Sequence, residues 1–145
     1  MNKPKVLFLC SGNTARSQMA EAFLRKYAGE YFDVYSAGLE PGELNPFTIK
    51  VMDEVGIDMS NHYAKGLEQF FMKVNFAYMI TVCDRAEKSC PVFPGMGKRV
   101  FWPIEDPAAF DGPDDGKIIT FRKTRDEISV RVMDWLHELG IQPAD

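Results

Sequence analysis

A chain of 145 residues, 46% hydrophobic and 26% charged, is long enough to bury a substantial core, and we expect a single domain over residues 1–145. The net charge of −4 and the lack of a basic stripe argue against a nucleic-acid partner, and no apolar run approaches membrane-spanning length. Residues 1–5 lead straight into an apolar run without a cleavable small-residue site, so we expect no signal peptide and a cytoplasmic location.

Strand and helix patterns alternate along the chain. Short apolar runs predict strands at residues 5–9, 31–37, 75–82 and 98–102. Apolar residues at helical spacing predict helices at 17–28, from Pro46 (capped by Asn45) to the stop at Gly56, and at 117–139, with a short helix after the third strand. This order predicts an α/β fold: a four-stranded parallel sheet with helices on both faces, a three-layer sandwich of the Rossmann type.

Two cysteines follow predicted strands directly. Cys10 ends the first apolar run, and Cys83 comes after the third. Ligands of parallel sheets bind at the carboxyl ends of the strands, so we expect both thiols at one rim of the sheet.

The segment Cys10–Ser17 reads Cys-Ser-Gly-Asn-Thr-Ala-Arg-Ser, which is a small-residue loop that enters a helix. We interpret it as a cradle for a tetrahedral oxyanion, with Cys10 as nucleophile and Arg16 as a fork for two oxygens. The residues expected to surround the anion are Ser11, Gly12, Asn13, Thr14, Ala15, Arg16 and Ser17. The plain alternative is a buried apolar Cys10 with a solvated Arg16, but an Arg at a helix start is unfavourable unless an anion lies there. Ser17 is expected to donate to the thiolate, to cap the helix, or both.

The chain has three cysteines, an odd number, whose spacing does not suit zinc, and we expect neither a bound metal nor a cofactor. Cys83 and Cys90 are seven positions apart, which is ~10.5 Å along a helix, whereas a disulfide needs Cα atoms within about 7 Å. The pair can bond only if the short polar segment between them unwinds, which suggests a redox switch. The alternative is two unrelated thiols.

A carboxyl pair follows the fourth predicted strand, in the run Trp102–Pro107. At the rim of the sheet, Asp106 could act as general acid for a leaving oxygen, and Glu105 is the weaker candidate. The alternative is a simple Asp-Pro turn.

The Cys10–Ser17 loop, the cysteines at 10, 83 and 90 and the run Trp102–Pro107 together resemble the thioredoxin-coupled arsenate reductases, which share their fold with low-molecular-weight protein tyrosine phosphatases. The resemblance implies that Cys10 attacks arsenate and Asp106 assists the loss of water. It further implies that Cys83 then attacks Cys10, and that Cys90 attacks Cys83 to leave a disulfide for thioredoxin. Phosphate and sulfate would compete for the loop, and a monomer is expected.

Some members of that family bind potassium through an Asn, a Glu, a Ser and an Asp. Asn13, Glu21 and Ser36 match the first three positions, but Lys65 stands at the fourth, where its ammonium would repel the ion. We therefore expect no potassium site. Two other functions stay open: a small phosphatase whose remaining cysteines protect Cys10, and an oxidation sensor.

Overall fold

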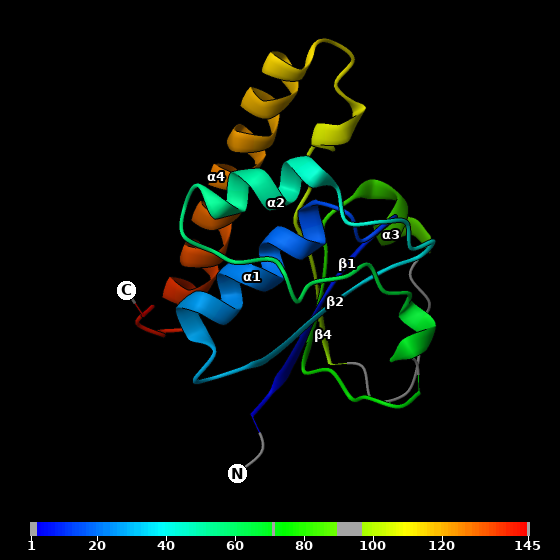
Figure 1. Cartoon of the computed structure of the whole chain (residues 1–145). Helices are drawn as coiled ribbons and strands as arrows, with labels where there is room; N and C mark the ends of the chain where they lie inside the picture. The colour runs from blue at the N-terminus through cyan, green and yellow to red at the C-terminus, as the bar shows by residue number, and fades with distance from the viewer. Residues whose placement is uncertain (1–2, 71, 90–96, 145) are drawn as a thin grey trace.

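The computed structural model describes residues 3–70, 72–89 and 97–144. Its sheet has four parallel strands in the order β2-β1-β3-β4, which confirms the predicted α/β class (Figure 1). The strands are β1 (Lys5–Cys10), β2 (Asp33–Gly38), β3 (Tyr78–Thr81) and β4 (Lys98–Phe101). The α-helices are α1 (Arg16–Ala28), α2 (Pro46–Asp53), α3 (Asp84–Ser89) and α4 (Asp114–Glu138), and the 3₁₀ helices are η1 (Leu67–Gln69) and η2 (Pro107–Ala109).

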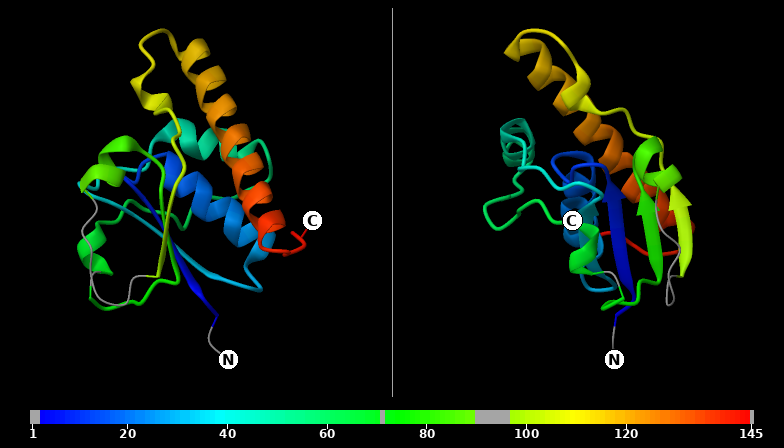
Figure 2. Two further views of the ribbon diagram at one scale, coloured as in Figure 1. Left: turned by 180° about the vertical axis from the view of Figure 1, so that it is seen from behind. Right: turned by 90° about the vertical axis from the view of Figure 1, so that its right-hand side faces the viewer.

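The helices cover both faces of the sheet. α1 and α4 lie on one face and pack against each other, and α2 packs on α4 (Figure 1). α3 and η1 lie on the opposite face, as the view from behind also shows (Figure 2). Among the described residues, no helix is both long enough and apolar enough to cross a membrane.

Several element boundaries differ from the prediction. β2 begins at Asp33 rather than 31, and β3 is limited to Tyr78–Thr81, the residues that pair with both β1 and β4. α4 begins three residues early because Asp114 and Asp115 place carboxylates at its amino end, where the helix dipole favours them. Leu139, the last residue of the predicted helix, lies one residue beyond the end of α4 and is 38% exposed.

The order of the strands places the site. The chain leaves β1 toward β2 on one side and later adds β3 on the other, so the crevice between the carboxyl ends of β1 and β3 is the switch point where such sheets bind ligands. Cys10 ends β1, and Cys83 lies two residues beyond β3. Val6–Leu9 of β1 are fully buried, so the loop that follows Cys10 starts from a rigid strand.

Candidate active site

The loop after β1 turns its carbonyl oxygens outward. The carbonyls of Cys10, Ser11 and Gly12 accept from the amides of Leu39 (3.1 Å), Glu40 (2.9 Å) and Gly42 (3.0 Å). The Thr14 carbonyl accepts from the Asn45 amide at 3.1 Å and from Thr48 Oγ1 at 3.0 Å. Because a trans peptide points its C=O and N–H in opposite directions, the loop amides face the other way, toward the cradle.

Cys10 lies at the floor of this cradle and is 2% exposed. Its Sγ receives a hydrogen bond from the Asn13 amide at 3.2 Å and lies 2.9 Å from Ser17 Oγ. The thiolate is the nucleophilic form of cysteine, and its sulfur can accept both of these contacts. Ser17 is not the cap of α1: that position is held by Ala15, which makes no side-chain capping bond, and the Ser17 hydroxyl is turned to Cys10.

Asn13 shapes the loop from inside. It has a φ of 55°, in the left-handed region that Asn tolerates better than most residues. Its Nδ2 donates to Ser17 Oγ (2.8 Å) and Ser36 Oγ (2.9 Å). Gly38 leaves room for this turn, because a Cβ there would come within 2.8 Å of the Asn13 nitrogen. Asn13 is therefore a structural centre of the cradle rather than a rim residue.

Arg16 is the first residue of α1 and is 8% exposed. Its Nη1 donates to the Ile104 carbonyl at 3.0 Å, and its Nη2 lies 3.6 Å from Asp106 Oδ2. A cavity of about 430 Å³ is lined by Ser11, Arg16, Cys83 and Asp106, among others. The guanidinium is thus anchored by one nitrogen and faces a cavity that a tetrahedral anion would fit.

Asp106 belongs to this cavity and also to a turn. Its Oδ1 accepts from the Ala108 amide at 3.0 Å and so caps η2, and its side chain is 44% exposed. The turn interpretation of the Asp-Pro pair is therefore confirmed, and the carboxyl also faces the cavity, so its role as general acid stays a prediction. Glu105 lines the same cavity, but no ion pair joins it to Arg16 among the described residues.

Cys83 lies across the cavity from the loop and is 5% exposed. Its Sγ lies 3.6 Å from Ser11 Oγ and accepts from the Ala86 amide at 3.3 Å, at the start of α3. The helix predicted between the two later cysteines is present as α3, whereas Cys90 itself lies outside the described residues. The structure thus brings together the surroundings of two thiols that are 73 positions apart.

Within residues 3–70, 72–89 and 97–144, no group of three or more His, Cys, Asp or Glu is arranged to hold an ion. The positions that match a potassium site do not fit one, because Lys65 Nζ lies 3.5 Å from Glu21 Oε1 and takes the place of a cation beside that carboxylate.

Three groups that hold residues of the site in place were not expected from the sequence. Gln18 donates to the Asn13 carbonyl (3.2 Å), to Asn13 Oδ1 (2.9 Å) and to the Tyr63 carbonyl (2.8 Å). His62 Nδ1 lies 3.0 Å from Gln18 Oε1, and burial lowers the pKa of this imidazole. The Ile104 carbonyl holds Arg16. The sequence offered one signal for these groups, which is that Gln18 is a polar residue within the apolar pattern of α1.

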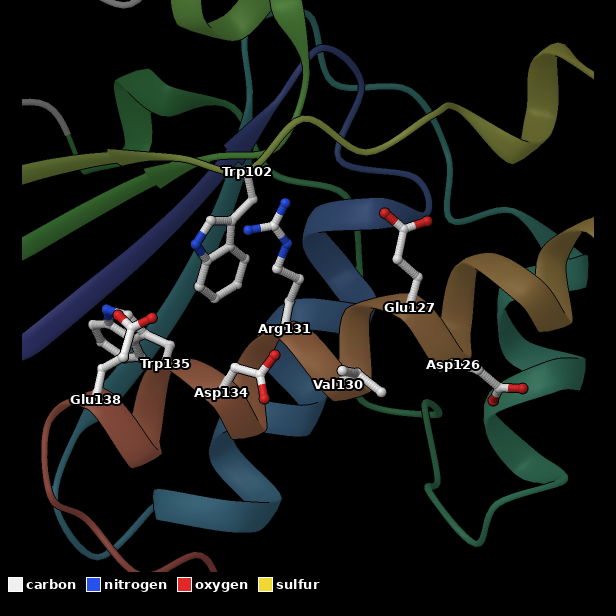
Figure 3. A pocket seen from close by; sticks show the side chains of 8 residues that line it. All are labelled: Trp102, Asp126, Glu127, Val130, Arg131, Asp134, Trp135 and Glu138. Atoms are coloured by element: carbon white, nitrogen blue, oxygen red, sulfur yellow. The ribbon is translucent and has the colours of Figure 1, made fainter.

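A second cavity of about 490 Å³ lies between Trp102 and one face of α4 (Figure 3). Its other lining side chains all come from that helix: Asp126, Glu127, Val130, Arg131, Asp134, Trp135 and Glu138. None of these lining residues is a cysteine or belongs to the loop of residues 10–17.

The chain has many relatives of known structure or function. It is 42% identical over 132 residues to an arsenate reductase of Halalkalibacterium halodurans, which covers 91% of this chain and 94% of that protein. A solved arsenate reductase in the phosphate binding state superposes with a TM-score of 0.73 at 31% identity, covering 93% of this chain and 98% of the other.

A thioredoxin-dependent arsenate reductase from Corynebacterium glutamicum superposes with a TM-score of 0.71 at 29% identity, covering 95% of this chain and 62% of the other. The family model for low molecular weight phosphotyrosine protein phosphatases matches residues 5–144, a span that includes the cradle, Cys83 and Asp106. With a thiol at the end of β1, a loop of inward amides and an Arg at the start of α1, the chain belongs to the low molecular weight phosphotyrosine protein phosphatase family.

Proposed function

We propose that this protein reduces arsenate to arsenite through a relay of three cysteines and is regenerated by thioredoxin. The observation that carries the proposal is the second thiol at the cradle: Cys83 Sγ is 3.6 Å from Ser11 Oγ and lines the same cavity as Arg16. A phosphatase needs only the first thiol. The similarity to arsenate reductases over nine-tenths of the chain supports the same activity.

In the first step the cradle binds arsenate through the loop amides and Arg16. The Cys10 thiolate attacks arsenic and an S–As bond forms, while the As–O bond of one hydroxyl group breaks and that hydroxyl leaves as water after Asp106 donates a proton to it. Arg16 and the loop amides balance the charge on the remaining oxygens. The Asn13 amide and the Ser17 hydroxyl are within hydrogen-bond distance of the Cys10 sulfur that makes this attack.

In the second step the Cys83 thiolate attacks Cys10 Sγ. A Cys10–Cys83 disulfide forms, the S–As bond breaks, and its electron pair stays on arsenic, which leaves as arsenite. Two thiols have then supplied two electrons, and arsenic has passed from the +5 to the +3 state. Cys83 lies at the amino end of α3, and the Ala86 amide donates to its sulfur at 3.3 Å, a contact that a thiolate strengthens.

In the third step the Cys90 thiolate attacks Cys83, which releases Cys10 and leaves a Cys83–Cys90 disulfide. α3 must unwind for this bond to form, because residues 84–89 are helical before oxidation. The helix is six residues long, so it is marginal by itself, and it is tied to the sheet at Glu87, which accepts from Thr81 Oγ1 and Arg99. Thioredoxin then reduces the exposed disulfide.

The partners follow from the same chemistry. Phosphate and sulfate have the shape of arsenate and compete for the cradle without being reduced. The protein acts as a monomer in the cytoplasm, where thioredoxin keeps thiols reduced.

The proposal is tested by counting thiols. Arsenate is added in excess to the reduced protein without any reductant, and free thiols are counted after denaturation. We expect the three thiols to fall to one, arsenite to appear in a 1:1 ratio to protein, and peptide mapping to find a Cys83–Cys90 disulfide. A protein that keeps all its thiols and forms no arsenite would refute the reductase.

Two variants locate the step at which oxidation stops. Cys90→Ser is expected to form one arsenite and to stall with a Cys10–Cys83 disulfide, which thioredoxin reduces slowly. Cys83→Ser is expected to release no arsenite and to form no disulfide, although Cys10 is still protected from alkylation by phosphate. Arsenite release by Cys83→Ser would contradict the assigned order.

The phosphatase alternative shares Cys10, Arg16 and Asp106, so hydrolysis of a small aryl phosphate can accompany reduction as a side activity. In η2 the residues after Asp106 are Pro107, Ala108 and Ala109, which offer no aromatic ring to stack on a phosphotyrosine. The relatives named arsenate reductase also favour reduction. Robust phosphotyrosine hydrolysis together with an unchanged thiol count would reverse this order.

A further inference from the structure

A lysine is buried behind the cradle. Lys65 is 8% exposed, its Nζ lies 3.5 Å from Glu21 Oε1, and the same Nζ donates to the Tyr63 carbonyl at 3.0 Å. Glu21 is itself only 5% exposed. Charged groups are rarely buried this deeply unless they are paired with an opposite charge. We therefore expect this ion pair to have a structural or functional role.

Glu21 is the end of a hydrogen-bond chain that starts at the nucleophile. Its Oε1 accepts from Ser36 Oγ at 2.5 Å, and Ser36 Oγ accepts from Asn13 Nδ2 at 2.9 Å. Asn13 Nδ2 also donates to Ser17 Oγ at 2.8 Å, and Ser17 Oγ lies 2.9 Å from Cys10 Sγ. Ser17, Ser36 and Asn13 have no exposed surface, so water does not compete for these bonds.

The direction in which each hydrogen bond is donated follows from the two ends of this hydrogen-bond chain. An ionised Glu21 can only accept, so Ser36 must donate its hydrogen there. The Asn13 amide cannot be flipped, because its Oδ1 accepts from the Lys65 backbone N–H at 2.8 Å. Both Nδ2 hydrogens are then committed to the two serines, and the hydroxyl hydrogen of Ser17 is left for Cys10 Sγ.

We propose that Lys65 is a positioning residue: its ammonium is a built-in cation that holds the Glu21 carboxylate in place and thereby aims the Ser17 hydroxyl at the Cys10 thiolate. Lys65 faces Oε1, the oxygen that also binds Ser36, whereas Arg25 lies 2.8 Å from Oε2 with a side chain that is 50% exposed. His62 Nδ1 lies 3.7 Å from Oε2, on the side away from Ser36, and burial lowers the pKa of this imidazole.

As a consequence, we expect the reactivity of Cys10 not to depend on added monovalent cations. Three positions match the potassium ligands of related enzymes, yet the fourth carries the charge that such an ion would supply. Because the inference concerns the activation of Cys10, it relies on the proposed function only for the identity of the nucleophile. It can therefore be read from alkylation of Cys10, which needs neither arsenate nor thioredoxin.

The experiment measures the rate of Cys10 alkylation by iodoacetamide and, separately, arsenate reduction. Wild-type protein is expected to react equally fast in potassium, sodium and tetramethylammonium chloride at one ionic strength. Lys65→Ala is expected to lose about 10-fold or more in both rates, as removal of a residue that orients a functional group from behind typically does. A cavity of about 480 Å³ adjoins Lys65 and Glu21, so ethylammonium or potassium should restore the alkylation rate of Lys65→Ala, and tetramethylammonium should not.

Lys50→Ala removes an exposed lysine of α2 and serves as the matched control, with wild-type rates expected in every salt. Lys65→Met keeps the apolar stem without the charge, and its thermal unfolding separates loss of activation from loss of fold. The proposal is overturned by a wild-type rate that rises with potassium, by wild-type alkylation in a folded Lys65 variant, or by a slow Lys65→Ala that no cation rescues. A fast alkylation rate with no arsenite formed would instead refute the proposed function alone.

Discussion

Replacing Asp106 by Asn should slow the first chemical step and leave oxyanion binding nearly unchanged. The Asn carbonyl can still accept from the Ala108 amide, so η2 keeps its cap. The lost ion pair with Arg16 spans 3.6 Å, and the Asp106 side chain is 44% exposed. Ion pairs in which solvent reaches one partner, as it reaches Asp106, contribute about 0–1 kcal/mol, so binding should change by less than about 6-fold. A general acid contributes roughly 10²–10⁴ in rate, and that factor is what the variant should lose.

The two effects are measured separately. Phosphate protection of Cys10 against iodoacetamide reports affinity without any chemistry, and the single-turnover appearance of arsenite reports the rate. Glu105→Gln is the matched control, because Glu105 lines the same cavity without an ion pair to Arg16, and its rate should stay near that of the wild type. A wild-type rate in Asp106→Asn, or an equal loss in Glu105→Gln, would refute the acid role of Asp106.

Three further variants test other parts of the molecule. Cys10→Ser should abolish arsenite formation while the thermal unfolding temperature stays close to wild type, and residual turnover would move the nucleophile elsewhere. Arg16→Lys should weaken phosphate binding by about 10- to 100-fold in the protection assay, because one ammonium cannot hold the Ile104 carbonyl and also grip two oxygens; unchanged affinity would remove Arg16 from the site. Hydrogen bonds from Arg122 lower the pKa of Glu54 from 4.5 to about 2, so Glu54→Gln should lower the urea midpoint at pH 7. That difference should shrink as the pH falls below 4.5 and vanish near pH 2, and a difference independent of pH would contradict it.

Much of the fold could be predicted from local patterns in the sequence, and so could the part of the site formed by Cys10, the loop after it and Cys83. The apolar run before Cys10 and the small residues after it predict a buried strand that ends in a loop, and both are present. Parallel strands end at one rim, so the meeting of Cys83 with the loop could be anticipated across 73 positions. These predictions succeed because each depends on periodicity or on the general geometry of a parallel sheet.

The residues that contact the loop from behind could not be predicted in the same way. Tyr63 and Lys65 lie in a coil without periodicity, which the pairing of Gly38 with Gly66 brings back to the end of β2. A sequence pattern reports which residues are apolar, but not which coil residue reaches a given loop. The ammonium of Lys65 could be judged unsuited to a potassium ligand, yet its contact with Glu21 depends on the tertiary fold.

The outward carbonyls of the cradle also link anion binding to the stability of the folded state. They are held by amides of Leu39, Glu40, Gly42 and Asn45, which are distant in sequence, so no isolated β1-loop-α1 unit can retain the shape of the cradle. An anion bound by the inward amides therefore stabilises only the fully folded chain, by about 2.7 kcal/mol at a phosphate concentration 100 times its Kd. Hydrogen exchange at those four amides would slow as phosphate is added, which makes residues on the back of the loop reporters of an anion that they never touch.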